Sequence, residues 1–128
     1  MERAKYVLSL FLTDFTPEEI AYCAENAYTA EKFGSDQIAQ ISKVEEGEYL
    51  LELWHGPTCA FKDMALQMLP HLLSASLSKN EEQKTVCILV ATSGDTGKAA
   101  LEGFKDVDRT KILVFYPKDG VSKVQETQ

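Results

Sequence analysis

The alternation of strand-like and helix-like segments from residue 48 onward is the feature that most constrains the fold of this chain. The expected order is a strand over 48–53, a helix from about Phe61 to Leu77, a strand Thr85–Thr92, a helix from Lys98 to about Phe104 and a strand Lys111–Tyr116. The strand at 85–92 is apolar at nearly every position, which is typical of parallel strands covered on both faces. Strands that alternate with helices need right-handed crossovers. The order therefore predicts an α/β fold, with a partial parallel sheet and flanking helices.

Residues 1–40 are expected to form a helical leader ahead of the α/β segment. Apolar residues favour a first helix over residues 3–12. A second helix is expected to begin after Thr16, because Pro17 suits the first helical position and Glu19 can complete a capping box with Thr16. The leader is thus predicted to contain at least two short helices, one of them with a well-defined start.

The α/β segment spans residues 41–128 and is expected to be an incomplete domain. Apolar residues alternate on either side of Glu45-Glu46-Gly47, which predicts a β-hairpin. Pro70 lies inside the predicted helix at 61–77 and removes a backbone donor, so a kink or break is expected there. Residues 121–128 have the pattern of the first two turns of a helix, and the predicted sheet has uncovered edges. Either a small domain with a frayed tail or a piece of a longer protein explains these features.

Composition and charge narrow the classes of partner. The 128 residues carry a formal net charge of −7 and no cluster of lysines and arginines, which argues against a nucleic-acid or anionic-membrane partner. The longest apolar run, Val86–Ala91, is far shorter than the roughly 20 residues that span a bilayer. The three cysteines, an odd number, fit reduced thiols better than a disulfide framework. We therefore expect a cytoplasmic protein without a membrane partner.

Two loops that join a predicted strand to a predicted helix carry the candidate chemistry, since α/β sheets bind ligands at such loops. The first loop, WHGPTCAFKD at 54–63, places Lys62 at or near the first turn of a helix. The positive end of a helix disfavours a charged ammonium, and Schiff-base chemistry needs a lysine that readily loses its proton. A solvated surface lysine is the alternative interpretation. His55 and Cys59 are not followed by a second ligand pair, so we expect no metal site.

The second loop is ATSGDTGK at 91–98. Its glycines allow close backbone approach, and the N-terminus of the following helix supplies N–H groups that can bind an anion. The spacing is not that of a nucleotide P-loop, and Asp95 would repel a bare phosphate. A plain strand-to-helix turn, capped by Ser93 or Asp95, fits the local pattern equally well.

Taken together, the two loops resemble a known family. The segments LELWHGPTCAFKDMALQ (51–67), VATSGDTGKAA (90–100) and FYPKDGVSKVQETQ (115–128) are similar to segments of threonine synthases. These are pyridoxal-phosphate enzymes of the fold type that includes the tryptophan synthase β chain. The resemblance covers nearly the whole chain and implies an N-terminal-region fragment of a fold type II enzyme, because threonine synthases are several times longer.

The resemblance implies a lyase that converts O-phospho-L-homoserine and water to L-threonine and phosphate, with pyridoxal 5′-phosphate as cofactor. The groups that hold the cofactor phosphate and face its pyridine nitrogen would lie outside this chain. We therefore expect the isolated chain to be inactive and to need the remainder of the parent chain as its partner. Two alternatives are a threonine-synthase-like phospho-lyase that releases a keto acid, and a non-catalytic α/β binding module.

The resemblance also implies roles for individual residues. Lys62 matches the lysine that carries the cofactor as a Schiff base and acts in catalysis, while Gly94 and Asp95 would lie beside the cofactor. His55 and Thr58 are weaker candidates near the site. The residues expected to bind the substrate carboxylate are Thr92, Ser93, Thr96 and Gly97.

Overall fold

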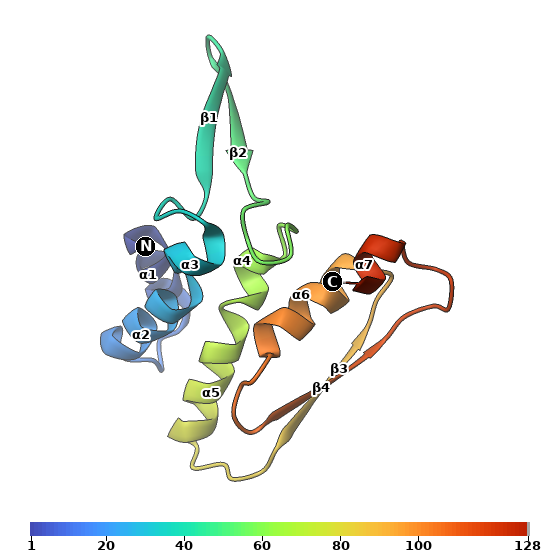
Figure 1. The fold of residues 1–128 in the computed structure, drawn as a ribbon. Helices are drawn as coiled ribbons and strands as arrows, with labels where there is room; N and C mark the ends of the chain where they lie inside the picture. Colours follow the sequence, from blue (N-terminus) through green and yellow to red (C-terminus); the bar gives the residue numbers. More distant parts are fainter. Residues whose placement is uncertain (128) are drawn as a thin grey trace.

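A computed structural model describes residues 1–127 of the chain and has an α/β architecture (Figure 1). Its helices are α1 Glu2–Phe11, α2 Pro17–Ala27, α3 Ala30–Phe33, α4 Asp63–Leu66, α5 Leu69–Lys79, α6 Asp95–Phe104 and α7 Lys123–Thr127. Its strands are β1 Gln40–Glu45, β2 Glu48–Glu52, β3 Val86–Ala91 and β4 Thr110–Phe115. Within residues 1–127, every helix is too short or too polar to cross a membrane.

The two helices predicted for the leader are confirmed, and α2 begins as the sequence indicates. The Thr16 hydroxyl accepts from the Glu19 backbone N–H at 3.2 Å, and the Glu19 carboxylate accepts from the Thr16 N–H at 2.8 Å. This is the reciprocal capping box expected ahead of Pro17. The short helix α3 was not predicted. The buried face of α2 packs against α5, so the leader helices share a core with the helices that follow the hairpin.

The predicted hairpin is confirmed, but its second strand was assigned to the wrong sheet. β1 and β2 pair antiparallel from Gln40↔Glu52 to Glu45↔Glu48, and the hairpin projects from the helices (Figure 1). Among residues 1–127 the parallel sheet contains β3 and β4, not the three strands expected. Strand propensity identifies a strand without identifying its partner, and a tight turn places β1 next to β2 at a low entropy cost.

The parallel pair β3–β4 is confirmed, with α6 as its crossover. Its register runs from Val86↔Thr110 to Ala91↔Phe115. One face packs against α6, whereas the other exposes Leu89, Leu113 and Phe115, which are 66%, 53% and 63% accessible. We expected both faces of this sheet to be covered because its strands are apolar on both faces. Within residues 1–127 that expectation is wrong, since only the face toward α6 is covered.

The helix predicted at 61–77 is interrupted, as expected, but not at Pro70 itself. α4 ends at Leu66, and Pro70 lies in the first turn of α5. An N–H in the first turn of a helix has no acceptor within the helix, so the missing N–H of Pro70 removes no helical hydrogen bond. The following helix, α6, starts at Asp95 rather than Lys98, so the second half of the SGDTG sequence is helical. α4 packs against α6, which places the two candidate loops on neighbouring elements.

Candidate functional site

The lysine loop, residues 54–63, leads directly into α4, whose first residue is Asp63. Lys62 is the N-cap residue of this helix, as the sequence predicts, and its side chain is half-buried. The Lys62 Nζ lies 4.2 Å from the centroid of the exposed Phe61 ring, a cation–π geometry. The amine is thus held at the start of a helix and against an aromatic ring, not extended into solvent.

Asp63, which the sequence analysis did not single out, is the most buried polar group of this loop. It is 1% exposed, and its two carboxylate oxygens accept from the Thr58 N–H at 2.8 Å and the Thr58 hydroxyl at 2.7 Å. We call this pair of bonds the Thr58–Asp63 clamp. Thr58 is therefore buried and bonded within the loop. The sequence shows an acidic residue directly after Lys62, but it does not show that this residue is buried.

His55 is bonded to the base of the hairpin. Its Nε2 lies 2.5 Å from Glu52 Oε2, and its ring lies 5.6 Å from the ring of Trp54. Glu52 also accepts a hydrogen bond from the Ser42 hydroxyl. The Ser42 bond, followed by the His55 bond, holds the pKa of Glu52 below its ordinary value. The weak candidate His55 thus has an identifiable structural partner in Glu52.

The SGDTG segment, residues 93–97, opens α6 without the side-chain cap that was expected. Gly94 is the N-cap residue with φ +153°, a conformation that L side chains rarely adopt, and neither Ser93 nor Asp95 caps the helix. The Thr92 hydroxyl instead accepts from the N–H groups of Gly94 at 3.2 Å and Gly97 at 3.3 Å. The interpretation of this segment as a turn capped by Ser93 or Asp95 is wrong. Thr92 organises the start of α6.

Asp95 has polar contacts with Gln125 and Lys98. Its Oδ1 accepts from the Gln125 Nε2 of α7 at 2.9 Å and lies 3.5 Å from the Lys98 Nζ. The Gln125 bond lowers the pKa of Asp95 below its ordinary value, and the positive charges of Lys98 and Lys62 act in the same direction. The lysine loop and the SGDTG segment lead into elements that are in contact, since α4 packs against α6.

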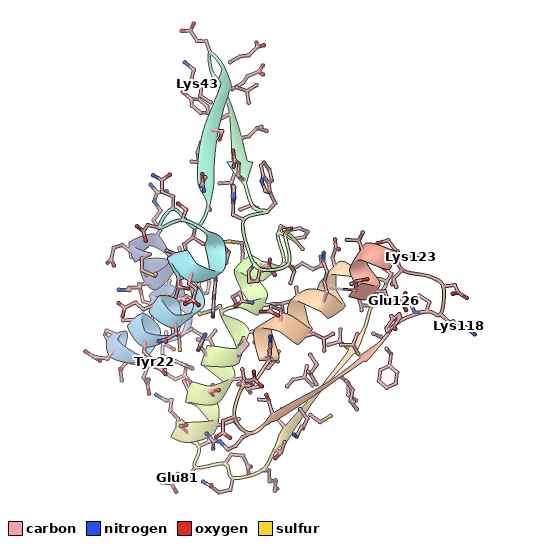
Figure 2. The ribbon with its side chains drawn as sticks, in the orientation of Figure 1. Tyr22, Lys43, Glu81, Lys118, Lys123 and Glu126 are labelled. Carbon is pink, nitrogen blue, oxygen red and sulfur yellow. The ribbon has the colours of Figure 1, made fainter. Side chains whose placement is uncertain are left out.

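A cavity of about 240 Å³ opens beside the SGDTG segment. Figure 2 shows α7, which carries Lys123 and Glu126, next to the start of α6 on this side of the molecule. The cavity is lined by residues of the SGDTG segment, α6, β4 and α7, among them Thr92, Gly94, Lys98, Val114 and Gln125. Ser93 is exposed and Thr96 half-buried at the start of α6. The predicted substrate-binding residues are therefore clustered around one helix N-terminus.

The donor set suits a carbonyl cofactor that also carries negative charge. A primary amine, that of Lys62, can form a Schiff base with an aldehyde. The N-terminus of α6 can bind a carboxylate or phosphate through its N–H groups. The carboxylate of Asp95, which is charged at neutral pH, can orient a positively polarised group. These residues fit pyridoxal phosphate and an amino-acid substrate.

Comparison with known proteins gives a consistent result, although no family model matches the chain. The chain is 47% identical over 96 residues to the threonine synthase of Pseudomonas aeruginosa, covering 75% of this chain and 20% of that protein. It is 36% identical over its whole length to human threonine synthase-like 1, covering 18% of that protein. The crystal structure of pyridoxal-phosphate-bound threonine synthase from Brucella melitensis matches 97% of this chain at a TM-score of 0.86 and 36% identity. The chain covers 26% of that structure. It thus spans about a fifth to a quarter of the length of these relatives.

Proposed function

Because this chain is homologous to part of the threonine synthases, we propose that it belongs to a pyridoxal-phosphate-dependent threonine synthase, a lyase. The proposed reaction converts O-phospho-L-homoserine and water to L-threonine and phosphate. The remainder of the complete protein, meaning the longer protein of which this chain would be one part, would supply the rest of the cofactor site. The proposal is supported by the solved relative, which was crystallised with pyridoxal phosphate.

Lys62 is the proposed catalytic residue. Its amine would bind the cofactor covalently and would also accept and return protons at the substrate carbons. When bound, pyridoxal phosphate supplies an electron sink for this chemistry. The position of Lys62 supports the proposal, since its half-buried side chain lies at the start of α4, which packs against α6 and so neighbours the SGDTG segment.

The SGDTG segment is the proposed binding surface for the rest of the cofactor and for the substrate. Gly94 and Asp95 would lie beside the cofactor, while the Ser93 and Thr96 hydroxyls would bind the substrate carboxylate at the start of α6. Gly97, whose N–H already donates to the Thr92 hydroxyl and to Gly94 O, would contribute to substrate binding by lining the cavity. Thr92 would act mainly by holding this segment in shape, because its hydroxyl already accepts two backbone N–H groups. His55 and Thr58 would contribute indirectly through their own loop contacts.

The observation that carries the proposal is the packing of α4 against α6, which brings the lysine loop and the SGDTG segment, about thirty residues apart in the sequence, onto neighbouring elements. The complete protein, supplied with pyridoxal phosphate and O-phospho-L-homoserine, should release phosphate and L-threonine in equal amounts. Phosphate release without threonine, or no phosphate release at all, would contradict the proposed reaction.

A threonine-synthase-like phospho-lyase is the second candidate, because such an enzyme would share the lysine loop and the SGDTG segment. Human threonine synthase-like 1, a relative that is named as similar to a threonine synthase, matches the chain over its full length. A phospho-lyase would release phosphate together with a keto acid and ammonia, with no net addition of water at the position that phosphate leaves. The same assay therefore separates the two reactions by product analysis. A protein without catalytic function would give neither product.

The open face of the β3–β4 sheet supports the proposal that more of the protein packs here. Leu89, Leu113 and Phe115 form a contiguous apolar surface opposite α6. Exposed apolar patches of this kind mark interaction surfaces. We assign this face to the remainder of the complete protein.

A cytoplasmic location is also part of the proposal. It rests on the odd number of cysteines, three, which fits reduced thiols better than disulfides.

A further inference from the structure

We propose that Asp63 is a positioning residue that sets the Lys62 amine through the Thr58–Asp63 clamp. Asp63 is 1% exposed, and both of its carboxylate oxygens bond to Thr58. It acts through the backbone of the lysine loop, in which Lys62 immediately precedes it. The inference rests on the proposed function, because it assumes that Lys62 carries the cofactor.

The clamp closes the lysine loop on itself. Both oxygens of the Asp63 carboxylate accept from the same residue, the Thr58 N–H at 2.8 Å and the Thr58 hydroxyl at 2.7 Å. Two bonds to one residue fix an orientation as well as a distance. The backbone supports the same turn, since the Asp63 N–H donates to Ala60 O at 3.0 Å and the Cys59 N–H donates to Gly56 O at 3.0 Å. The lysine loop is therefore held by hydrogen bonds near Gly56 and again at Asp63, directly after Lys62.

Close packing at Gly56 leaves this arrangement little room to change. A Cβ at Gly56 would lie 2.5 Å from Asp63 Oδ2, closer than real Cβ atoms come to such an oxygen. The loop therefore passes directly over the carboxylate, which is 1% exposed. A buried carboxylate needs hydrogen-bond donors, because its desolvation is otherwise unfavourable. Thr58 supplies two such donors, so the loop and the carboxylate hold each other in place.

The consequence for Lys62 follows from its place in the chain. Its carbonyl accepts from the Leu66 N–H at 2.9 Å, as the first bond of the α4 turn, and its neighbour Asp63 is anchored by the clamp. The Lys62 backbone is thus fixed on its C-terminal side, and only its side-chain torsions remain adjustable. A fixed backbone limits the positions that the amine can reach. A covalent cofactor site needs this restriction, because the reacting atoms must be held in the correct geometry.

The test compares Thr58→Val with Thr58→Ser in the complete protein. Valine keeps the size and branching of threonine but removes the hydroxyl donor, whereas serine keeps the donor. The readouts are the rate of covalent attachment of pyridoxal phosphate to Lys62, trapped with borohydride and located by peptide mapping, and the pH dependence of the cofactor absorbance. We expect Thr58→Val to slow attachment about tenfold or more and to shift the pH profile, as the loss of a hydrogen bond to a buried charge implies. We expect Thr58→Ser to stay within about threefold of the wild type.

Attachment by Thr58→Val at the wild-type rate, with an unchanged pH profile, would overturn the positioning role while leaving the proposed function intact. A wild-type protein that does not attach the cofactor at Lys62 would overturn both. A variant that fails to fold does not remove the test, because hydrogen exchange at the Thr58 amide can be measured in the wild-type protein before cofactor is added. The clamp predicts exchange there as slow as at the Gln67 amide of the following helix turn. Fast exchange at Thr58 would overturn the proposal, since the clamp would not exist in advance of the cofactor.

Discussion

Gln125 donates a hydrogen bond from its Nε2 to Asp95 Oδ1 at 2.9 Å, so α7 is joined to the first turn of α6. The bond is the largest cause of the lowered pKa of Asp95. It links the SGDTG segment to a residue thirty positions further along the chain, a contact that no local sequence pattern indicates. The ionisation of a candidate cofactor-binding carboxylate thus depends on a residue from a different element.

Replacing Gln125 with alanine should raise the pKa of Asp95 toward its ordinary value, because the hydrogen bond favours the charged carboxylate. NMR titration of the Asp95 carboxyl carbon measures this directly. Lys123→Ala, on the same short helix, is the matched control and should leave the titration nearly unchanged. A Gln125→Ala titration identical to that of the wild type would show that the bond does not control Asp95.

Asp95→Asn separates the charge of this residue from its shape. The Asp95 side chain is 50% exposed, and asparagine keeps an oxygen that can accept from Gln125, so we expect only a small change in thermal stability. In the complete protein loaded with pyridoxal phosphate, we expect a shifted pH profile of the cofactor absorbance and a lower turnover, since a carboxylate near the cofactor favours its positively charged forms. An unchanged profile together with unchanged turnover would assign the function of the segment to Ser93, Thr96 and the backbone amides.

The contact between Glu19 and Lys79 should make stability depend on pH in a defined direction. The Lys79 Nζ lies 2.9 Å from Glu19 Oε2, and this bond, followed by that from the Thr16 N–H, lowers the pKa of Glu19. A carboxyl group with a lowered folded-state pKa stabilises the fold above its ordinary pKa of 4.5, and that stabilisation is lost as the pH falls through the folded-state value. Thermal unfolding of Glu19→Gln should therefore differ from wild type at neutral pH and coincide with it in acid. Glu18→Gln removes the same charge from the same turn, and an equal loss of stability in this control would contradict the assignment.

The isolated chain should have no threonine synthase activity. Its residues provide the amine of Lys62 and the SGDTG segment, but the proposed site also needs groups from the remainder of the complete protein. Purified residues 1–128, mixed with pyridoxal phosphate and O-phospho-L-homoserine, should release no phosphate above a protein-free background. Turnover by this chain alone would show that the other groups are dispensable.

Much of the fold could be predicted because its signals are local. The capping box at Thr16, the turn between β1 and β2 and the apolar strand β3 each depend on a few neighbouring residues, and each is confirmed. The sheet to which β2 belongs could not be predicted in the same way. Its partner is chosen by chain geometry and loop entropy rather than by its own side chains. The apolar side chains of β3 likewise show that both of its faces can be buried. They do not show that, within residues 1–127, only one face is covered, by α6.

The candidate site follows the same division. Lys62 could be placed at a helix start from the residues around it, and the structure confirms that position. The burial of Asp63, its two bonds to Thr58 and the contact of Gln125 with Asp95 could not be predicted, because each depends on how loops meet in three dimensions. Thr92 was expected to bind substrate, yet its hydroxyl accepts backbone N–H groups of α6, a role that depends on where that helix begins.

The central claim is that Lys62 holds pyridoxal phosphate in the complete protein. Borohydride reduction of the loaded protein, followed by proteolysis and mass spectrometry, identifies the modified lysine. We predict that the label lies on the peptide containing Lys62, that Lys62→Ala abolishes it, and that Lys98→Ala retains it although Lys98 also lies in the first turns of a helix. A label on Lys98, or a label that persists in Lys62→Ala, would contradict the account.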